Sequence, residues 1–260
     1  MTRNPPTPST SLCRHTANEI FYRRRNLVGE LLGNASFTDV LFYQILAREP
    51  NNAERQIVDA VLVALMEHGL TPSATAARLV YTGSPDNIQA GVAAGLLAVG
   101  SAFVGTTEDC AALLAALTRA DDLATAARAC VAGHVEKKKA LPGFGHHLHR
   151  PDDPRAKMLL ALAAKLETAA GHCRALDVLS GEVDRAIGRH LTINATGAVA
   201  AILADIGVPA RAMRGFALIS RAAGLVAHLV EEQERPTGRA IWALVDKEIP
   251  YRADAPSERD

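Results

Sequence analysis

The sequence predicts an all-α protein, and three observations carry that prediction. Apolar residues recur three and four positions apart in segment after segment, no segment alternates apolar and polar residues, and alanine and leucine are abundant. The chain has 260 residues, of which 48% are hydrophobic and only 4% aromatic, which is enough for a sizeable core. We expect a multi-helical architecture in which alanine-rich faces let helices approach closely.

The apolar spacing places ten helices along the chain. They are expected at residues 37–47, 53–67, 74–82, 85–97, 108–118, 121–138, a segment beginning at 154, 174–188, 197–206 and 209–230. Asn51 or Asn52 can cap the second helix, and Asp153 followed by Pro154 supplies a cap and a first-turn proline for the seventh.

Two helical segments are apolar almost all round, residues 85–102 and 209–230. A helix with little polar surface is buried, and in a chain of this size part of that burial is expected against a second subunit. We therefore expect a homodimer.

The domain organisation is expected to be simple. Residues 1–24 begin with a polar stretch rich in proline, serine and threonine and are expected to form a flexible tail, as are residues 248–260. Between them, residues 25–247 form one helical domain with a smaller subdomain at roughly 106–195.

Charge, hydropathy and cysteine usage exclude several functional classes. The formal net charge is +0, and the longest basic tract is the three lysines at 137–139, which argues against a nucleic-acid partner. No apolar run reaches the roughly 18–20 uncharged residues of a membrane span. The four cysteines (Cys13, Cys110, Cys130 and Cys173) form no C-x-x-C pair, so we expect a cytoplasmic protein without a disulfide framework or a zinc site.

Candidate chemistry concentrates in one segment, PGFGHHLHRPDDPR at 142–155. It combines two glycines, three histidines (His146, His147 and His149) and two arginines (Arg150 and Arg155). Imidazoles exchange protons near neutral pH, guanidinium groups suit carboxylates and phosphates, and glycines let a ligand approach the main chain. A surface loop with incidental histidines is the alternative. A metal site is disfavoured because no carboxylate–histidine spacing accompanies the three imidazoles.

This segment resembles the signature of the citrate synthase family, and other segments follow in the family's order. They are PGFGH at 142–146 with DPRA at 153–156, EHGLTPSAT at 67–75, NATGA at 194–198, SR at 220–221 and RP at 235–236. The resemblance covers roughly residues 25–245. The chain is similar to the short, citryl-CoA lyase-like branch of the family, without the long N-terminal part of full citrate synthases.

The resemblance implies roles for substrate-binding residues. His68 matches a histidine that binds the keto-acid or citrate part of the substrate, and His146 matches one that polarises the carbonyl or, in reverse, the hydroxyl. Arg155 and Arg221 match arginines that hold carboxylates. His147 is a further candidate, as is Arg235, which matches an arginine contributed by the second subunit.

The resemblance also implies a coenzyme A site in the same loop. The backbone of residues 142–146, which includes Gly143, Phe144 and Gly145, matches the loop around the adenine end. Arg150 matches a basic position that contacts the phosphates of coenzyme A. No metal cofactor is implied.

Two positions depart from the family pattern. Phe103 stands where citrate synthases carry the histidine of a Gly-Pro-Leu-His-Gly segment, and Thr196 stands in place of the catalytic aspartate. Neither side chain can serve as a base near neutral pH, and a lost general base costs about 10²–10⁴-fold in rate. Thr196 is either a helix N-cap or, with His147, a candidate for the missing acid–base task. Phe103 packs or lines an acyl pocket.

The sequence therefore predicts a lyase that cleaves a 3-hydroxy-3-carboxyacyl-CoA such as citryl-CoA to an acyl-CoA and a keto acid. Two alternatives stay open. One is condensation or hydrolysis of a different acyl-CoA in the same pocket. The other is a non-catalytic homologue that binds CoA thioesters. No nucleic acid or membrane is expected among the partners.

Overall fold

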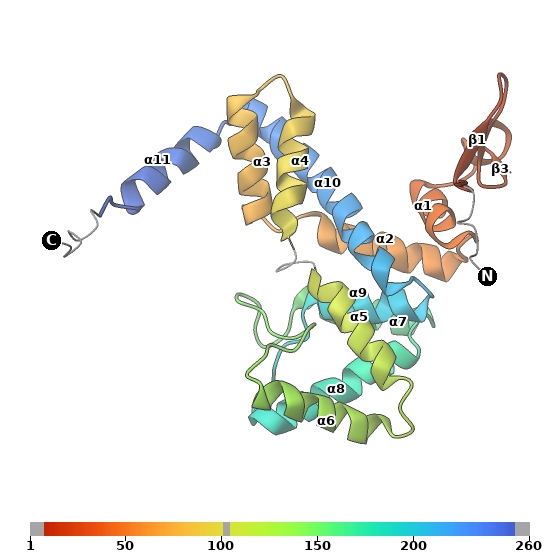
Figure 1. Cartoon of the computed structure of the whole chain (residues 1–260), viewed down its shortest axis with the longest axis vertical. Coiled ribbons are helices and arrows are strands. Elements are labelled where there is room, and N and C mark those ends of the chain that lie inside the picture. The colour runs from red at the N-terminus through yellow and green to blue at the C-terminus, as the bar shows by residue number, and fades with distance from the viewer. Residues whose placement is uncertain (1–7, 101–104, 253–260) are drawn as a thin grey trace, which may run out of the picture.

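The computed structural model describes residues 8–100 and 105–252, and helices dominate it (Figure 1), which confirms the all-α class. The helices are α1 (Phe37–Leu46), α2 (Asn52–Met66), α3 (Pro72–Gly83), α4 (Ile88–Val99), α5 (Thr106–Leu117), α6 (Leu123–Glu136), α7 (Pro154–Lys165), α8 (Gly171–Ile187), α9 (Ala195–Asp205), α10 (Ala210–Glu234) and α11 (Gly238–Glu248). A short π-helix, η1 (Leu27–Leu31), precedes α1.

Polar caps fix where several helices begin. Asn51 caps α2 in a capping box with Glu54, and Asp153 caps α7 with Pro154 in its first turn, as the sequence predicts. The helix expected from residue 174 begins earlier, at Gly171. The Asp205 carboxylate accepts hydrogen bonds from the backbone N–H groups of Ala170, His172 and Cys173, and this tertiary cap starts α8 one turn sooner.

Part of the segment expected to be an N-terminal tail is a small sheet. Three strands, β1 (Cys13–His15), β2 (Ile20–Tyr22) and β3 (Arg25–Asn26), pair antiparallel in the order β1-β2-β3. The Arg14 guanidinium lies 3.8 Å from the centre of the Phe21 ring, and Arg23 donates to the backbone oxygen of Gln44 in α1. These long-range contacts, which no alternation in the sequence signals, order the segment. The other domain boundaries stay predictions.

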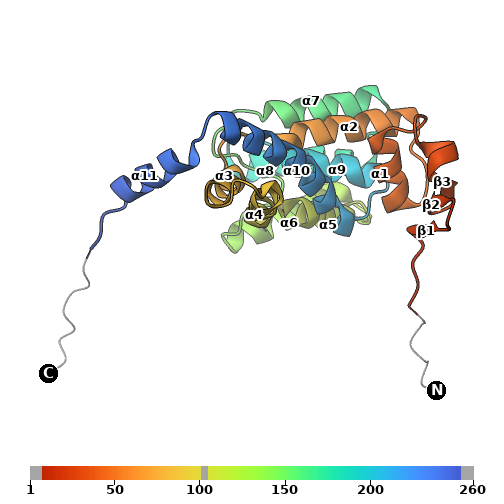
Figure 2. The ribbon, with the colours of Figure 1, turned by 90° about the horizontal axis from the view of Figure 1, so that it is seen from above.

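Helix α9 is buried along most of its length and packs against α2, α5, α7, α8 and α10. In Figure 1, α5, α6 and α8 lie on one side of α9, while α3 and α4 lie on the other and pack against α10. Gly91 and Gly95 on α4 allow this second contact, because a Cβ at either would lie within 2.7 Å of a leucine side chain of α10. α11, which the sequence analysis missed, projects from the end of α10 (Figures 1 and 2).

One helix of the described residues, α10, is long and apolar enough by composition to cross a membrane. It also packs against α2, α3, α4, α5 and α9 and carries eight buried residues, as the central helix of a folded core does.

The close approach of α10 to the end of α2 generates a stability prediction. A Cβ at Gly224 would lie 2.1 Å from the backbone oxygen of Met66, whereas a Cβ at Gly215 on the same helix meets nothing within 4 Å. We expect Gly224→Ala to lower the free energy of unfolding by about 2 kcal/mol or more, because backbone must move to relieve the clash. Gly215→Ala, the matched control, should raise it by about 0.5–1 kcal/mol through helix propensity. Urea denaturation measures both, and equal effects of the two changes would contradict the prediction.

Candidate active site

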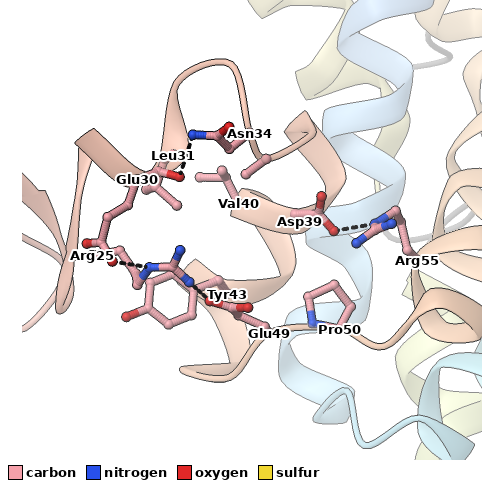
Figure 3. Close-up of a pocket in the computed structure, with 11 residues that line it drawn as sticks. Arg25, Glu30, Leu31, Asn34, Asp39, Val40, Tyr43, Glu49, Pro50 and Arg55 are labelled. Carbon is pink, nitrogen blue, oxygen red and sulfur yellow. Dashed lines mark hydrogen bonds and ion pairs between the residues drawn. The ribbon is translucent and has the colours of Figure 1, made fainter. Parts of the chain in front are cut away.

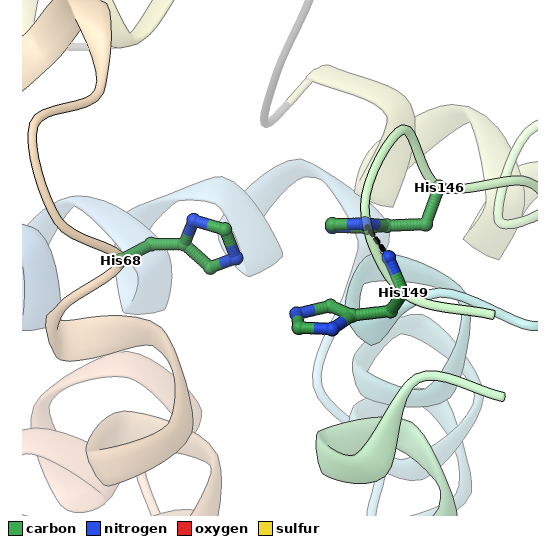
Figure 4. A group of neighbouring side chains, drawn as sticks. All are labelled: His68, His146 and His149. Atoms are coloured by element: carbon green, nitrogen blue, oxygen red, sulfur yellow. Dashed lines mark hydrogen bonds between the residues drawn. The ribbon is translucent and has the colours of Figure 1, made fainter.

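Two loops far apart in the sequence bring three imidazoles together (Figure 4). His68 lies in the loop between α2 and α3, and His146 and His149 lie in the loop between α6 and α7. The ring centre of His68 is 5.7 Å from that of His146 and 5.7 Å from that of His149, and the latter two rings stack at 4.4 Å. The structure thus brings His68 and His146 together with His149, one of the three histidines that the sequence indicates in segment 142–155.

The backbone of the second loop is fixed against the start of α9. Gly145 N–H donates to the Thr192 oxygen at 2.8 Å, and Asn194 N–H donates to the Gly143 oxygen at 3.0 Å. Gly143 has φ +87°, and a Cβ there would lie 2.9 Å from the Cα of Gly197 and 2.7 Å from the Cys110 sulfur. Only glycine fits this contact, which sets the direction in which His146 leaves the loop.

The hydrogen bonds of His146 determine which ring nitrogen carries its proton. Its Nδ1 accepts the backbone N–H groups of Leu148 at 3.1 Å and of His149 at 3.0 Å, so the neutral ring has its proton on Nε2. This Nε2–H lies 3.5 Å from Nη2 of Arg155, which is also a donor. Two donors at this distance cannot satisfy each other, so an oxygen acceptor placed beside both would complete their hydrogen bonding.

Asp153 holds Arg155 in this position. Its carboxylate side chain is completely buried and accepts the Nε of Arg155 at 3.1 Å, the Nη2 at 2.8 Å and the backbone N–H of Ala195 at 3.1 Å. Burial alone would raise the pKa of Asp153, but these hydrogen bonds and the charge of Arg155 outweigh it and lower the pKa. Asp153 therefore stays ionised and couples the starts of α7 and α9.

Arg221 on α10 supplies a second guanidinium. Its Nη1 is buried and has no hydrogen-bond partner among the residues that the structure describes. Burial and then the charge of Arg155 lower its pKa, whereas the charge of Glu67 acts in the opposite direction. A buried cationic donor without a partner is costly, so the site is built to receive an anionic oxygen.

The pKa values of two of the histidines, His68 and His146, are lowered, which favours their neutral forms at physiological pH. Burial lowers the pKa of His68, and the charge of Arg155 lowers it further; burial and the neighbouring His149 lower the pKa of His146. The positive charge that faces a ligand therefore comes from Arg155 and Arg221.

The three imidazoles also have the spacing of a metal site, since ligand atoms of His68, His146 and His149 all lie within 4.8 Å of one another. The Nδ1 lone pair of His146, however, accepts backbone N–H groups of its own loop, and its Nε2 carries a proton. With the guanidinium of Arg155 beside it, this geometry fits an oxyanion better than a cation.

The remaining candidates in the loop occupy different environments. His147 is exposed and stacks on His146 at 4.6 Å, Arg150 is exposed, and Phe144 is buried and pairs with Ile193. Phe103 lies outside the described residues.

Thr196 is not the helix cap. Asn194 caps α9 through its side-chain oxygen, which accepts Gly197 N–H, and Thr196 is the second residue of the helix. The Thr196 hydroxyl donates to the same Asn194 oxygen at 2.7 Å and accepts the hydroxyl of Thr106 at 3.2 Å. Asparagine is as good a cap as threonine and stands two residues earlier, which is why it takes the position. The proton of Thr196 is committed to this bond.

Arg235 lies at the C-terminal end of α10 with an exposed side chain, about 21 Å further along the helix axis than Arg221. Within one chain it does not join the cluster.

Sequence reasoning missed the parts played by Glu67 and Asp153. The sequence indicates Glu67 only as part of the segment EHGLTPSAT, and it indicates Asp153 only as a helix cap. The available signal was their position, since each lies within two residues of a candidate ligand-binding side chain, His68 or Arg155.

Two cavities lie outside the histidine cluster. One of about 130 Å³ sits between η1, α1 and α2 (Figure 3), where Arg25 pairs with Glu30 and Arg55 pairs with Asp39, so its charges are satisfied. The other, of about 280 Å³, adjoins the active-site loop. It is lined by Val131, His134, Val135, Lys138, Lys139, Ala140, Leu141, Val183, Ile187 and Leu191.

Comparison with known proteins gives consistent matches. The family described as "Citrate synthase, C-terminal domain" matches residues 11–242. The structure of citryl-CoA lyase from Hydrogenobacter thermophilus is similar with a TM-score of 0.87 and 32% identity over 98% of each chain. ATP citrate lyase from Methanothrix soehngenii shares the fold, with a TM-score of 0.81 and 17% identity over 99% of this chain and 44% of that chain.

Citrate synthase from Haloferax volcanii is 26% identical over 194 residues, which are 74% of this chain and 50% of that protein. The chain spans about half the length of the curated relatives that it matches.

The buried carboxylate of Asp153 generates a pH-dependent prediction. In Asp153→Asn an amide N–H₂ replaces one acceptor oxygen and faces donors, so we expect a loss of about 1–3 kcal/mol in the free energy of unfolding at pH 7. Because the folded-state pKa of Asp153 is lowered, its contribution is complete above the unfolded pKa of about 3.9 and is lost as the pH falls through the folded value.

Urea denaturation between pH 3 and pH 7 tests this. The difference between wild type and Asp153→Asn should shrink toward pH 3, while the exposed neighbour Asp152→Asn should show little difference at any pH. A difference that stays constant with pH would contradict the assignment.

Proposed function

Because the chain belongs to the citrate synthase family, we propose that it is a carbon–carbon lyase that cleaves a 3-hydroxy-3-carboxyacyl-CoA, such as citryl-CoA, to an acyl-CoA and a keto acid. Similarity to citryl-CoA lyase from H. thermophilus over nearly the whole of both chains supports this reaction class. Phe103 and Thr196 stand where the sequence resemblance expects the groups that remove a proton from an acetyl thioester. Neither side chain can act as that base, which argues against ordinary citrate synthesis from acetyl-CoA.

One observation carries the proposal. The Nε2–H of His146 and the Nη2 of Arg155 are 3.5 Å apart, both are donors, and no shared acceptor satisfies them within the described residues. Arg221 adds a buried guanidinium nitrogen that also has no partner there. A hydroxy acid has the matching groups, since its carboxylates pair with guanidiniums and its hydroxyl oxygen accepts from an imidazole.

Cleavage then follows from the protonation states of the site. His68, a neutral imidazole, accepts the proton of the tertiary hydroxyl. The Nε2–H of His146 stabilises the oxygen as it becomes the keto-acid carbonyl. The carbon–carbon bond breaks, and its electron pair passes to the thioester as an enolate. The enolate carbon takes a proton from a bound water, and the proton that His68 received returns to the resulting hydroxide, so no water is consumed overall.

The enolate needs stabilisation that Phe103 cannot give. The Thr196 hydroxyl donates to Asn194, so its proton is unavailable, and it contributes only an oxygen lone pair. Backbone N–H groups or a bound water therefore take the place of the family's histidine in our proposal.

Coenzyme A is proposed to bind beside the loop of residues 142–146. The cavity of about 280 Å³ there is mostly apolar and includes Ala140 and Leu141, which directly precede the loop. Lys138 and Lys139 are exposed and also line the cavity. An apolar wall beside two ammonium groups suits an adenine and its phosphates, and Arg150 adds a third cation nearby in sequence.

The first experiment is a coupled cleavage assay. The purified protein is given citryl-CoA, and oxaloacetate is measured through malate dehydrogenase and NADH consumption. We expect turnover, and we expect His146→Ala to reduce kcat by about 10²–10⁴-fold because the carbonyl oxygen loses its donor. His15→Ala, on the exposed strand β1, is the matched control and should retain full activity.

Absence of turnover in the wild type, with coenzyme A still raising the melting temperature, would overturn citryl-CoA as substrate. It would instead support condensation or hydrolysis of a different acyl-CoA, or a protein that binds CoA thioesters without catalysis.

We also propose that the protein is a homodimer in which α11 packs on a second copy. This helix projects from the body (Figure 2), and Trp242 is 68% exposed on the same apolar face as Val245 and Ile249. An exposed apolar helix face rarely persists without a partner. The exposed Arg235 at its base would then reach a site in the partner copy, as the family resemblance implies.

Light scattering tests the dimer. We expect wild type to have twice the chain mass of 27.5 kDa, and Trp242→Asp to shift it toward the monomer by placing a charge in the interface. Lys247→Ala, on the opposite face of α11, should leave the mass unchanged. A wild-type protein that is monomeric at every concentration would refute the proposal.

A further inference from the structure

A buried arginine lies behind the active site. Arg78 on α3 has a side chain that is 2% exposed. Its Nη1 donates to Glu232 at 2.8 Å, its Nη2 donates to Glu231, and its Nε donates to Nδ1 of His228 at 3.1 Å. All of these partners lie in the last two turns of α10.

The bond to Arg78 fixes the tautomer of His228. An arginine side chain has donors only, so the Nδ1 of His228 must offer its lone pair, and the ring proton of the neutral imidazole sits on Nε2. This Nε2 lies 2.9 Å from Oε2 of Glu67, an ion-pair distance, although its N–H is not aligned with that oxygen for a hydrogen bond. His228 therefore lies between a buried cation and a carboxylate and contacts both.

Glu67 connects His228 to the backbone of the active-site residue His68. Its other oxygen, Oε1, accepts the backbone N–H of His68 at 2.7 Å and that of Gly69 at 2.6 Å. α2 ends at Met66 and Gly69 has φ +73°, so the chain turns here without helical hydrogen bonds of its own. The carboxylate thus takes the place of the next helical turn and holds the point from which the His68 side chain extends.

The same carboxylate also supports Arg221, because its negative charge raises the pKa of that guanidinium. Glu67 therefore influences both α10 and the α2–α3 loop, each of which presents one side chain to the substrate.

We propose that His228 is a positioning residue which, through Glu67, sets the place of His68 relative to His146 and thereby the affinity of the site for the hydroxy-acid part of the substrate. This inference rests on the proposed function, in which His68 accepts the proton of the substrate's tertiary hydroxyl. His228 itself does not touch substrate, and it acts as a neutral spacer between Arg78 and Glu67.

Three variants separate positioning from stability. His228→Ala removes the imidazole that contacts Glu67. His228→Gln keeps an N–H of similar reach and should partly restore function. Leu225→Ala, in the same helix and completely buried, removes core packing without touching the chain from Arg78 to His68.

Calorimetry with the whole protein measures binding of citrate and, separately, of coenzyme A. We expect His228→Ala to weaken citrate binding by about tenfold and to leave coenzyme A binding unchanged. In the cleavage assay KM should rise more than kcat falls. Leu225→Ala should lower the melting temperature and leave citrate affinity at the wild-type value.

A readout without ligand keeps this inference separate from the proposed function. Histidine-ring NMR, with the His68 signal assigned from His68→Ala, should show that signal displaced in His228→Ala and returned toward its wild-type position in His228→Gln. A His68 signal and a citrate affinity that both stay unchanged in His228→Ala would overturn the proposal, as would an equal loss of citrate affinity in Leu225→Ala. If wild type binds no citrate, the citrate part of the proposed function fails, and the NMR comparison still decides whether His228 positions His68.

Discussion

The carboxylate of Asp153 is the constraint on which the site depends. It is completely buried, caps α7, accepts the first N–H of α9 and forms an ion pair with Arg155. One group therefore fixes two helix starts and the direction of a ligand-binding side chain. A carboxylate can be buried at this point because it accepts donors from three directions, which offsets the loss of its hydration.

Backbone contact fixes the loop that carries His146, as Asp153 fixes the side chain of Arg155. Gly143 and Gly197 touch through main-chain atoms, and no other residue fits at either position without displacing the other. The loop is therefore held by main-chain atoms, and this close contact is possible because glycine has no side chain. His146 can then commit its Nδ1 to the loop and present only a proton to the substrate.

The electrostatic design of the site is consistent with this division. The lowered pKa values of His68 and His146 favour their neutral forms, and the fixed positive charge resides on Arg155 and Arg221. Behind them, Arg78 is ion-paired with Glu231 and Glu232 and contacts His228, which in turn lies against Glu67. The guanidinium groups of Arg155 and Arg221 thus keep N–H donors for an anion after their contacts within the described residues are made.

The sequence by itself determined the fold class, the approximate place of ten helices and the identity of the main site residues. Helical periodicity and capping residues are properties of a short stretch of sequence, and a motif such as PGFGH can be recognised without the rest of the chain. Asp153 and Asn51 could be identified as caps because the residue type and its position relative to the helix are enough to predict a cap.

Only the tertiary structure decided which of these residues meet and what they do there. The small sheet at residues 13–26, the early start of α8 and the cap by Asn194 all depend on partners distant in sequence or on a choice between two capping residues two positions apart. The same holds for Thr196, whose hydroxyl is committed to a bond, and for the chain from Arg78 through His228 to His68. A residue's protonation state, tautomer and burial are set by its neighbours in space, and spacing along the chain carries no record of them.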